Sequence, residues 1–164
     1  MKILFIADMH SWHTSLWVKY FSENHSVYLL SDERTYAKNQ VYRNIKVIKH
    51  PGLIGKLIKY FNISSTFFRH LNKFLSTYIY VNLANKIIKT ENIDIVHAHS
   101  LYYGYVASKV KNKKIKIIFS PLGSDVMVDA FHKSFYKKMV NKVFSRVNII
   151  TSDSNAKLNA CRKL

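Results

Sequence analysis

Six short apolar runs recur along the chain, and a polar segment follows each of them. They cover residues 2–7, 26–31, 45–49, 93–97, 115–120 and 147–151. The first run, Lys-Ile-Leu-Phe-Ile-Ala, shows no alternation of apolar and polar positions, which is typical of a strand that is buried on both faces. The pattern therefore predicts six strands of a sheet that is covered on both sides.

Segments with helical periodicity lie between the apolar runs. The longest follows Pro51-Gly52, and its apolar residues recur at three- and four-residue steps from Phe67 to about Thr90. Other helices are expected over residues 14–24, 101–110 and 132–146, and after a cap at Ser152 or Asp153. Strands that alternate with helices form βαβ units. The sequence therefore predicts an α/β, Rossmann-like fold, in which a parallel sheet of strand order 3-2-1-4-5-6 carries helices on both faces.

Length and composition fit one globular domain over residues 1–164. Hydrophobic residues make up 48% of the 164 residues and charged residues 21%, which argues against disorder. The single Cys161 cannot form an internal disulfide and is expected to be a reduced thiol. No apolar run approaches the roughly 20 residues that a membrane-spanning helix needs, and Asp8 interrupts the short N-terminal run. We expect a cytoplasmic protein.

Positive charge is concentrated in one stretch. The formal net charge is +17, and no acidic residue lies between Glu33 and Glu91. Eleven cations lie there: Arg34, Lys38, Arg43, Lys46, Lys49, Lys56, Lys59, Arg69, Lys73, Lys86 and Lys89. Such a field attracts anionic membranes, nucleic acids or phosphorylated substrates, although a generally Lys- and Asn-rich proteome would produce the same excess.

Aromatic residues accompany part of this basic stretch. Phe67, Phe68, Phe74 and Tyr78 lie beside Arg69 and Lys73, a combination that suits the surface of a membrane. We therefore expect a membrane surface formed by Lys56, Lys59, Arg69 and Lys73, with the protein peripheral on the inner face of the plasma membrane. A nucleic-acid-binding domain is an alternative, but the chain carries no recognisable nucleic-acid motif, so we expect no nucleic-acid partner.

Polar residues follow four of the predicted strands, where the carboxyl ends of a parallel sheet place functional groups. These segments are residues 8–13, 97–100, 120–125 and 152–154. Their sequences include Ser-Trp-His-Thr-Ser-Leu-Trp (11–17), Asp-Ile-Val-His-Ala-His (94–99), Ser-Pro-Leu-Gly-Ser-Asp-Val (120–126) and Ile-Ile-Thr-Ser-Asp-Ser (149–154). In this order and spacing they resemble the N-terminal domain of family 4 glycosyltransferases of the two-domain GT-B type, over nearly the whole chain.

The resemblance implies a retaining transfer of a sugar from a nucleotide sugar to a sugar or lipid-linked acceptor, in polysaccharide biosynthesis. It implies that this domain binds the acceptor. A second domain with a Glu-rich motif would bind the nucleotide sugar as co-substrate, so no cofactor is expected here. We expect the chain to be inactive alone, as a truncated product, a fragment or half of a split enzyme. A non-catalytic subunit that recruits a separate donor-domain chain is the alternative.

Two positions depart from the family pattern. The turn after the first strand contains no glycine, which weakens the case for a phosphate cradle at Asp8 to Ser11. Many members carry a histidine directly before the Gly-Ser-Asp loop, where this chain has Leu122. The chain also lacks a nucleophile elbow, a Walker loop, a Cys-x-x-Cys pair and a zinc-protease motif. The dinucleotide fingerprint is absent as well, which speaks against a dehydrogenase.

Asp125 is the catalytic candidate, because a carboxylate at this loop could accept a hydrogen bond from a sugar hydroxyl. The alternative is that it caps the following segment through backbone N–H groups. The substrate-binding candidates are Asp8, His10, His13, His99, Ser100, Gly123 and Ser124.

The aromatic and polar residues near these candidates have simpler interpretations. His97 and His99 point to the same face of a strand, but two ligands without a third make a weak metal case, so no metal is expected. We expect His97 to be packed beneath the loops and His99 to line the cleft. Trp12 and Trp17 are expected to be core or helix-packing residues rather than sugar platforms, and residues 152–154 to cap the last helix.

Overall fold

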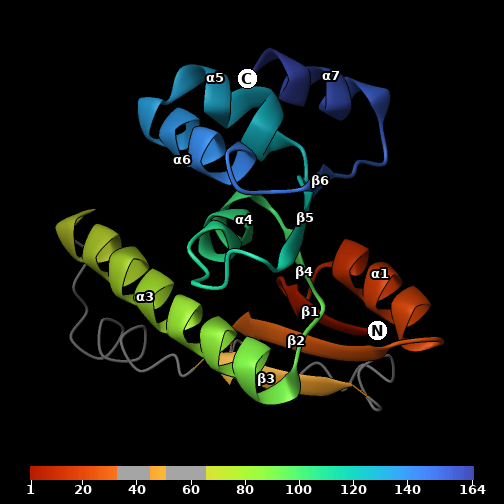
Figure 1. Ribbon diagram of the computed structural model, residues 1–164. Coiled ribbons are helices and arrows are strands. Elements are labelled where there is room, and N and C mark those ends of the chain that lie inside the picture. The colour runs from red at the N-terminus through yellow and green to blue at the C-terminus, as the bar shows by residue number, and fades with distance from the viewer. Residues whose placement is uncertain (33–44, 51–65) are drawn as a thin grey trace.

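The computed structural model describes residues 1–32, 45–50 and 66–164. Strands and helices alternate along the chain (Figure 1). The elements are β1 (Lys2–Ile6), α1 (Trp12–Ser22), β2 (Ser26–Asp32), β3 (Lys46–His50), α3 (Thr66–Glu91), β4 (Ile95–His99), α4 (Leu101–Ser108), β5 (Lys116–Ser120), the π-helical turn η2 (Asp125–Asp129), α5 (Ala130–His132), α6 (Ser134–Phe144), β6 (Ile149–Ile150) and α7 (Asn155–Lys163). This alternation confirms the predicted α/β class.

The six strands form one parallel sheet of order β3-β2-β1-β4-β5-β6, as the sequence predicts. β1 lies in the middle, where Ile3 pairs with Val27 of β2 on one side and with Ile95 of β4 on the other. Asp8, His99 and Asp125 therefore lie at or just after the carboxyl ends of their strands, on one edge of the sheet.

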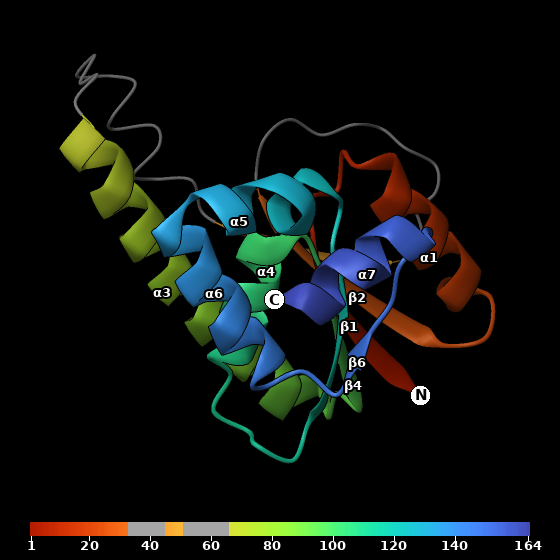
Figure 2. The same cartoon turned by 90° about the horizontal axis from the view of Figure 1, so that it is seen from above.

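Helices cover both faces of the sheet, because the strand side chains alternate between two cores. On one face, Leu4 and Ile6 pack with residues of α3 and α4, and on the other Ile3 and Phe5 pack with Val18 of α1. A third core joins Phe119 of β5 to helices α4, α5, α6 and α7. Of these, α5, α6 and α7 gather at the β6 side of the molecule (Figures 1 and 2).

Several boundaries differ from the sequence prediction. β4 covers Ile95–His99 rather than 93–97, since Ile93 is a buried residue of the turn that follows α3. The helix expected from 132 begins at Ser134, because Lys133 adopts an extended backbone that separates α5 from α6. α1 begins at Trp12, two residues before the expected Thr14. No helix among the described residues is long and apolar enough to cross a membrane.

Candidate functional site

His97 is packed beneath the loops, as expected, and it begins a short chain of hydrogen bonds. Its ring is 1% exposed, and Nε2 lies 2.8 Å from Oγ of Ser120 at the end of β5. The same Oγ lies 2.5 Å from the hydroxyl of Thr151, directly after β6. Burial lowers the pKa of His97 well below its ordinary value, and the nearby His99 lowers it further. The neutral ring thus links three neighbouring strands.

His99 shares this face of β4, with its ring centroid 4.6 Å from that of His97. Its Nδ1 lies 3.4 Å from the hydroxyl of Thr14, while its Nε2 is buried and has no hydrogen-bond partner within the described residues. Burial lowers the pKa of His99 to about 4, with a smaller contribution from His13. The ring is 1% exposed, so it lies deeper than the predicted cleft lining. Because Nε2 has no partner among the described residues, the assignment of His99 as a substrate-binding residue stays a prediction.

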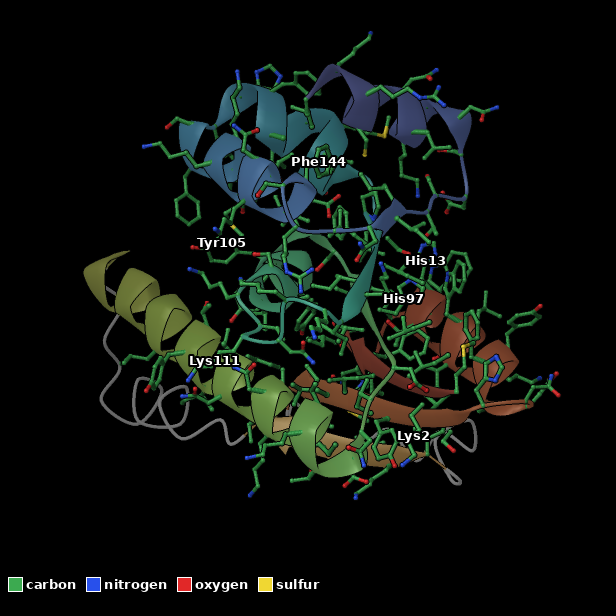
Figure 3. All side chains as sticks on the ribbon, viewed as in Figure 1. Lys2, His13, His97, Tyr105, Lys111 and Phe144 are labelled. Carbon is green, nitrogen blue, oxygen red and sulfur yellow. The ribbon has the colours of Figure 1, made fainter. Side chains whose placement is uncertain are left out.

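The first turn of α1 lies beside His99 (Figure 3). Figure 3 labels His13 here and His97 nearby in the sheet. The rings of Trp12 and His13 lie with centroids 3.7 Å apart and planes tilted by 30°, and Trp12 is 64% exposed, so the prediction of a core or packing position for Trp12 is wrong. Trp17 is half-buried and stacks on Phe21, as expected of a packing residue.

Asp8 and His10 form the turn that leads into α1. The Asp8 carboxylate accepts a hydrogen bond from the backbone N–H of His10, and both residues are exposed. The turn is therefore closed by the side chain of Asp8, which fits the absence of a glycine there. Neither side chain points to a specific ligand, and their assignment as substrate-binding residues stays a prediction.

Asp125 connects the loop after β5 to the start of α4. Its Oδ2 accepts hydrogen bonds from the N–H groups of Leu101 (2.8 Å) and Leu122 (3.4 Å). Its Oδ1 accepts from Gly123 (2.9 Å) and Val126 (3.1 Å). The carboxylate thus caps backbone groups, which was the alternative to a catalytic role. The catalytic role itself stays a prediction.

Two backbone conformations shape the loops that Asp125 holds together. Gly123 has φ of 138°, which side-chain-bearing residues rarely adopt. Ser100 has φ of 71° and ψ of 157°, a region that costs a non-glycine residue of the order of 1–3 kcal/mol. The N–H of Ser100 donates to the carbonyl oxygen of Ser120 at 2.9 Å, which helps to hold the turn. Ser124 is exposed and makes no side-chain cap of η2 within the described structure.

The segment after β6 completes this edge. Ser154 caps α7 by accepting a hydrogen bond from the N–H of Lys157, so the capping prediction for residues 152–154 is confirmed, although Ser154 and not Ser152 or Asp153 is the cap. Asp153 pairs with Lys157, which lowers the pKa of the carboxyl group, and His13 lowers it slightly further. The first turn of α1 and the start of α7 therefore lie close together.

Sequence reasoning missed the hydroxyl partners of the histidines. The sequence predicts Thr14 only as the first residue of a helix, and it identifies neither Ser120 nor Thr151 as a hydrogen-bond partner. The signal that could have found Ser120 is the parallel register of β4 and β5, which aligns His99 with Ser120.

The predicted membrane residues lie largely beyond what the structure describes. Lys56 and Lys59 lie outside the described residues. Arg69 and Lys73 fall in α3, where their side chains are outside the description. Among the described residues, no group of three or more histidine, cysteine or acidic side chains could hold a metal ion.

Solved structures of other proteins share this architecture. The chain is similar to the lipopolysaccharide outer core galactosyltransferase WaaB, with 16% identity and a TM-score of 0.63, and to the UDP-GlcNAc 2-epimerase from Methanocaldococcus jannaschii, with 12% identity and a TM-score of 0.59. Each match covers 99% of this chain and 42% of the other protein, so the chain spans about two fifths of their length.

A third match is a sucrose-phosphate synthase structure from Thermosynechococcus elongatus, with 10% identity and a TM-score of 0.50 over 99% of this chain and 95% of that one. At these identities the structures show the fold alone. No curated protein matches the chain significantly. The family model described as "Glycosyl transferase 4-like" matches residues 2–154, and the chain therefore belongs to that glycosyltransferase family.

Proposed function

We propose that this chain forms the acceptor-binding half of a retaining glycosyltransferase that transfers a sugar from a nucleotide sugar to a glycan or lipid-linked acceptor. The observation that carries the proposal is the buried Nε2 of His99, which has no partner within the described residues, in a chain of this family. A sugar hydroxyl can donate and accept, so it can satisfy this nitrogen in either neutral tautomer.

The environment of His99 favours a binding role over proton transfer. With a pKa of about 4, the ring is neutral at pH 7 and a weak general base. Phe5 and Trp17 surround it, with ring centroids 5.6 and 6.2 Å away, so the ring is held in place by packing. The charge of His13 also lowers the pKa of His99, so His13 lies in its neighbourhood, and within the proposal both contact the acceptor.

Asp125 contributes to the proposed site through the loop that it organises. Because both of its oxygens accept backbone hydrogen bonds, we favour a positioning role that fixes Gly123 and Ser124 beside the start of α4. Ser100, at the junction, is the remaining substrate-binding candidate. Direct catalysis by Asp125 requires that it exchange one of these bonds for a reacting hydroxyl.

The nucleotide sugar belongs to a second domain in this proposal, either in a longer protein or in a separate donor-domain chain. The shared coverage of 42% with WaaB supports it, since that galactosyltransferase has further chain beyond the matching part. We accordingly assign no cofactor to the 164 residues and place the protein in the cytoplasm.

Saturation-transfer difference NMR on the purified chain tests the proposal with two panels of ligands. We expect signals from neutral oligosaccharides and short polyprenyl-linked sugars, little signal from UDP- and GDP-hexoses, and no sugar transfer when the panels are mixed. His99→Gln should weaken the oligosaccharide signals, whereas His25→Gln, beyond the far end of α1, should leave them unchanged. Binding of nucleotide sugars alone, or robust turnover by the chain, would contradict the proposal.

A further inference from the structure

Large apolar side chains are exposed on the segment that follows β5. Val126 and Ala130 of this segment are buried in the third core, whereas Met127, Val128 and Phe131 are 43%, 52% and 48% exposed. Residues 127, 128 and 131 lie on the side of the helical run that is turned away from residues 126 and 130. The run thus has one apolar side in the core and another in solvent.

Phe135 in the first turn of α6 extends this surface. Its side chain is 61% exposed, while Met139, Val140 and Val143 of the same helix are buried. Figures 1 and 2 show α5 and α6 side by side at the outside of the molecule, on the β6 side of the sheet. We call Met127, Val128, Phe131 and Phe135, with Lys138 and Lys142 three and seven positions after Phe135 on α6, the α5–α6 face.

Cations and almost no acids accompany these apolar side chains. Residues 126–152 contain five Lys or Arg and one acid, Asp129. That carboxylate forms an ion pair with Lys133 at 2.5 Å, so it does little to offset the charge of the other cations. Lys137, Lys138 and Lys142 are exposed on α6. An apolar surface beside unopposed cations is complementary to a surface that is apolar below and negatively charged above.

We propose that the α5–α6 face binds the surface of an anionic lipid bilayer. Phe131 and Phe135 enter the headgroup region, where aromatic and apolar side chains are buried, and Lys138 and Lys142 lie among the lipid phosphates. A nucleic acid would satisfy the cations but leave the apolar side chains exposed, so the composition favours lipid. The proposal concerns a surface separate from the His99 site and does not depend on the proposed function.

Co-sedimentation with vesicles measures the electrostatic part of the proposal. The 164-residue chain is mixed with phosphatidylcholine vesicles with and without phosphatidylglycerol, at low and high salt. We expect binding to anionic vesicles that salt weakens. The double variant Lys138→Glu/Lys142→Glu should bind about tenfold or more weakly, since each cation near such a surface contributes about 1 kcal/mol.

A charge-matched control separates a built surface from net charge. Lys113→Glu/Lys114→Glu changes the formal charge by the same amount at two exposed lysines that precede β5, at the opposite end of that strand. We expect this variant to weaken binding by about twofold or less. Equal losses in the two double variants would overturn the proposal, because they would make the attraction a property of total charge.

A fluorescent reporter identifies the face that enters the lipid. Because Trp17 remains, each variant is compared with its Trp12→Phe parent: Phe135→Trp should add fluorescence that brominated lipids quench. Tyr78→Trp on α3 should add fluorescence that they do not quench, although Tyr78 is 65% exposed. Quenching at position 78 alone would assign the membrane contact to the α3 surface and overturn the proposal. Absence of vesicle binding would also overturn it and leave the face to a protein partner, such as a second domain or another copy.

Discussion

Helices α1 and α4 begin at the same edge of the sheet, but only α4 has a side chain that accepts a hydrogen bond from its first N–H group in the described structure. At the start of α4, the carboxylate of Asp125 accepts from the N–H of Leu101 and from three N–H groups of its own loop. At the start of α1, Ser11 makes no side-chain cap in the described structure, and no acidic residue lies in the first turn. Next to this start lies Nε2 of His99, which has no hydrogen-bond partner in the part of the chain that the structure describes.

We interpret the Asp125 loop as a structural scaffold and the start of α1 as the place where a ligand binds. Buried polar groups are nearly always hydrogen-bonded, and a group without a partner costs about 1–3 kcal/mol. The Asp125 loop meets that requirement internally, so it needs nothing from outside the chain. At the start of α1, Nε2 of His99 lacks a partner among the described residues, so a hydrogen bond from a ligand contributes most to binding there.

Removal of the Asp125 carboxylate should have the largest effect, because it leaves several N–H groups of the closed side without an acceptor. We expect Asp125→Ala to lower the free energy of unfolding by about 3–4 kcal/mol, measured by urea denaturation. Asp129→Ala, which removes an exposed pair with Lys133, should change it by less than about 1 kcal/mol. Similar losses in both variants would contradict the scaffold role.

Acid should destabilise the fold through the buried histidines. A histidine with a lowered folded-state pKa favours the unfolded state once that state takes up protons, so stability falls below about pH 6.5 and levels off below the folded pKa. For His99, with a pKa of about 4, the loss should reach about 3 kcal/mol at pH 4. Denaturation midpoints in the wild type and in His99→Gln check this. A curve that His99→Gln does not flatten would be evidence against it.

The two histidines should respond unequally to loss of their hydroxyl partners. Ser120→Ala removes a group that contacts both His97 and Thr151, and we expect a cost of about 2 kcal/mol. Thr14→Val removes only the 3.4 Å contact to His99, and we expect a cost below about 1 kcal/mol. Thermal unfolding of the two variants decides the order, and the reverse order would break the comparison.

The smallest difference in stability is expected between variants at the N-caps of α7 and α1. Ser154→Ala removes the cap of α7 and should cost about 1 kcal/mol. Ser11→Ala at the start of α1 should be nearly neutral, because that hydroxyl caps nothing in the structure as described. Chemical denaturation of this matched pair is sufficient. A larger loss in Ser11→Ala would show that α1 is capped after all.

The sequence was enough to predict the fold, because runs such as 2–7 and 115–120 are apolar on both faces and only a parallel sheet buries both. It did not predict where β4 ends, since Ile93 is as apolar as the strand that follows it. Strand order placed His99 and Asp125 at one edge correctly.

Their partners could not be predicted from the sequence. Asp125 meets Leu101 across 24 positions of sequence, and His97 meets Ser120 across 23. Such pairs depend on strand register and loop geometry, which the pattern of apolar positions does not specify. Trp12 was misjudged for a related reason: its size suggested the core, but its place at the first residue of α1 turns it toward solvent.

The central place of β1 has a consequence for synthesis on the ribosome. β1 is made first and finds β2 soon after, but its other neighbour, β4, begins about 90 positions later, as the bond between Lys2 and Asp94 illustrates. At about 5–20 residues per second, one edge of this apolar strand waits roughly 5–20 s for its partner. An open edge of this kind recruits strands from other nascent chains. The net charge of +17 opposes such encounters, because the growing chains repel one another.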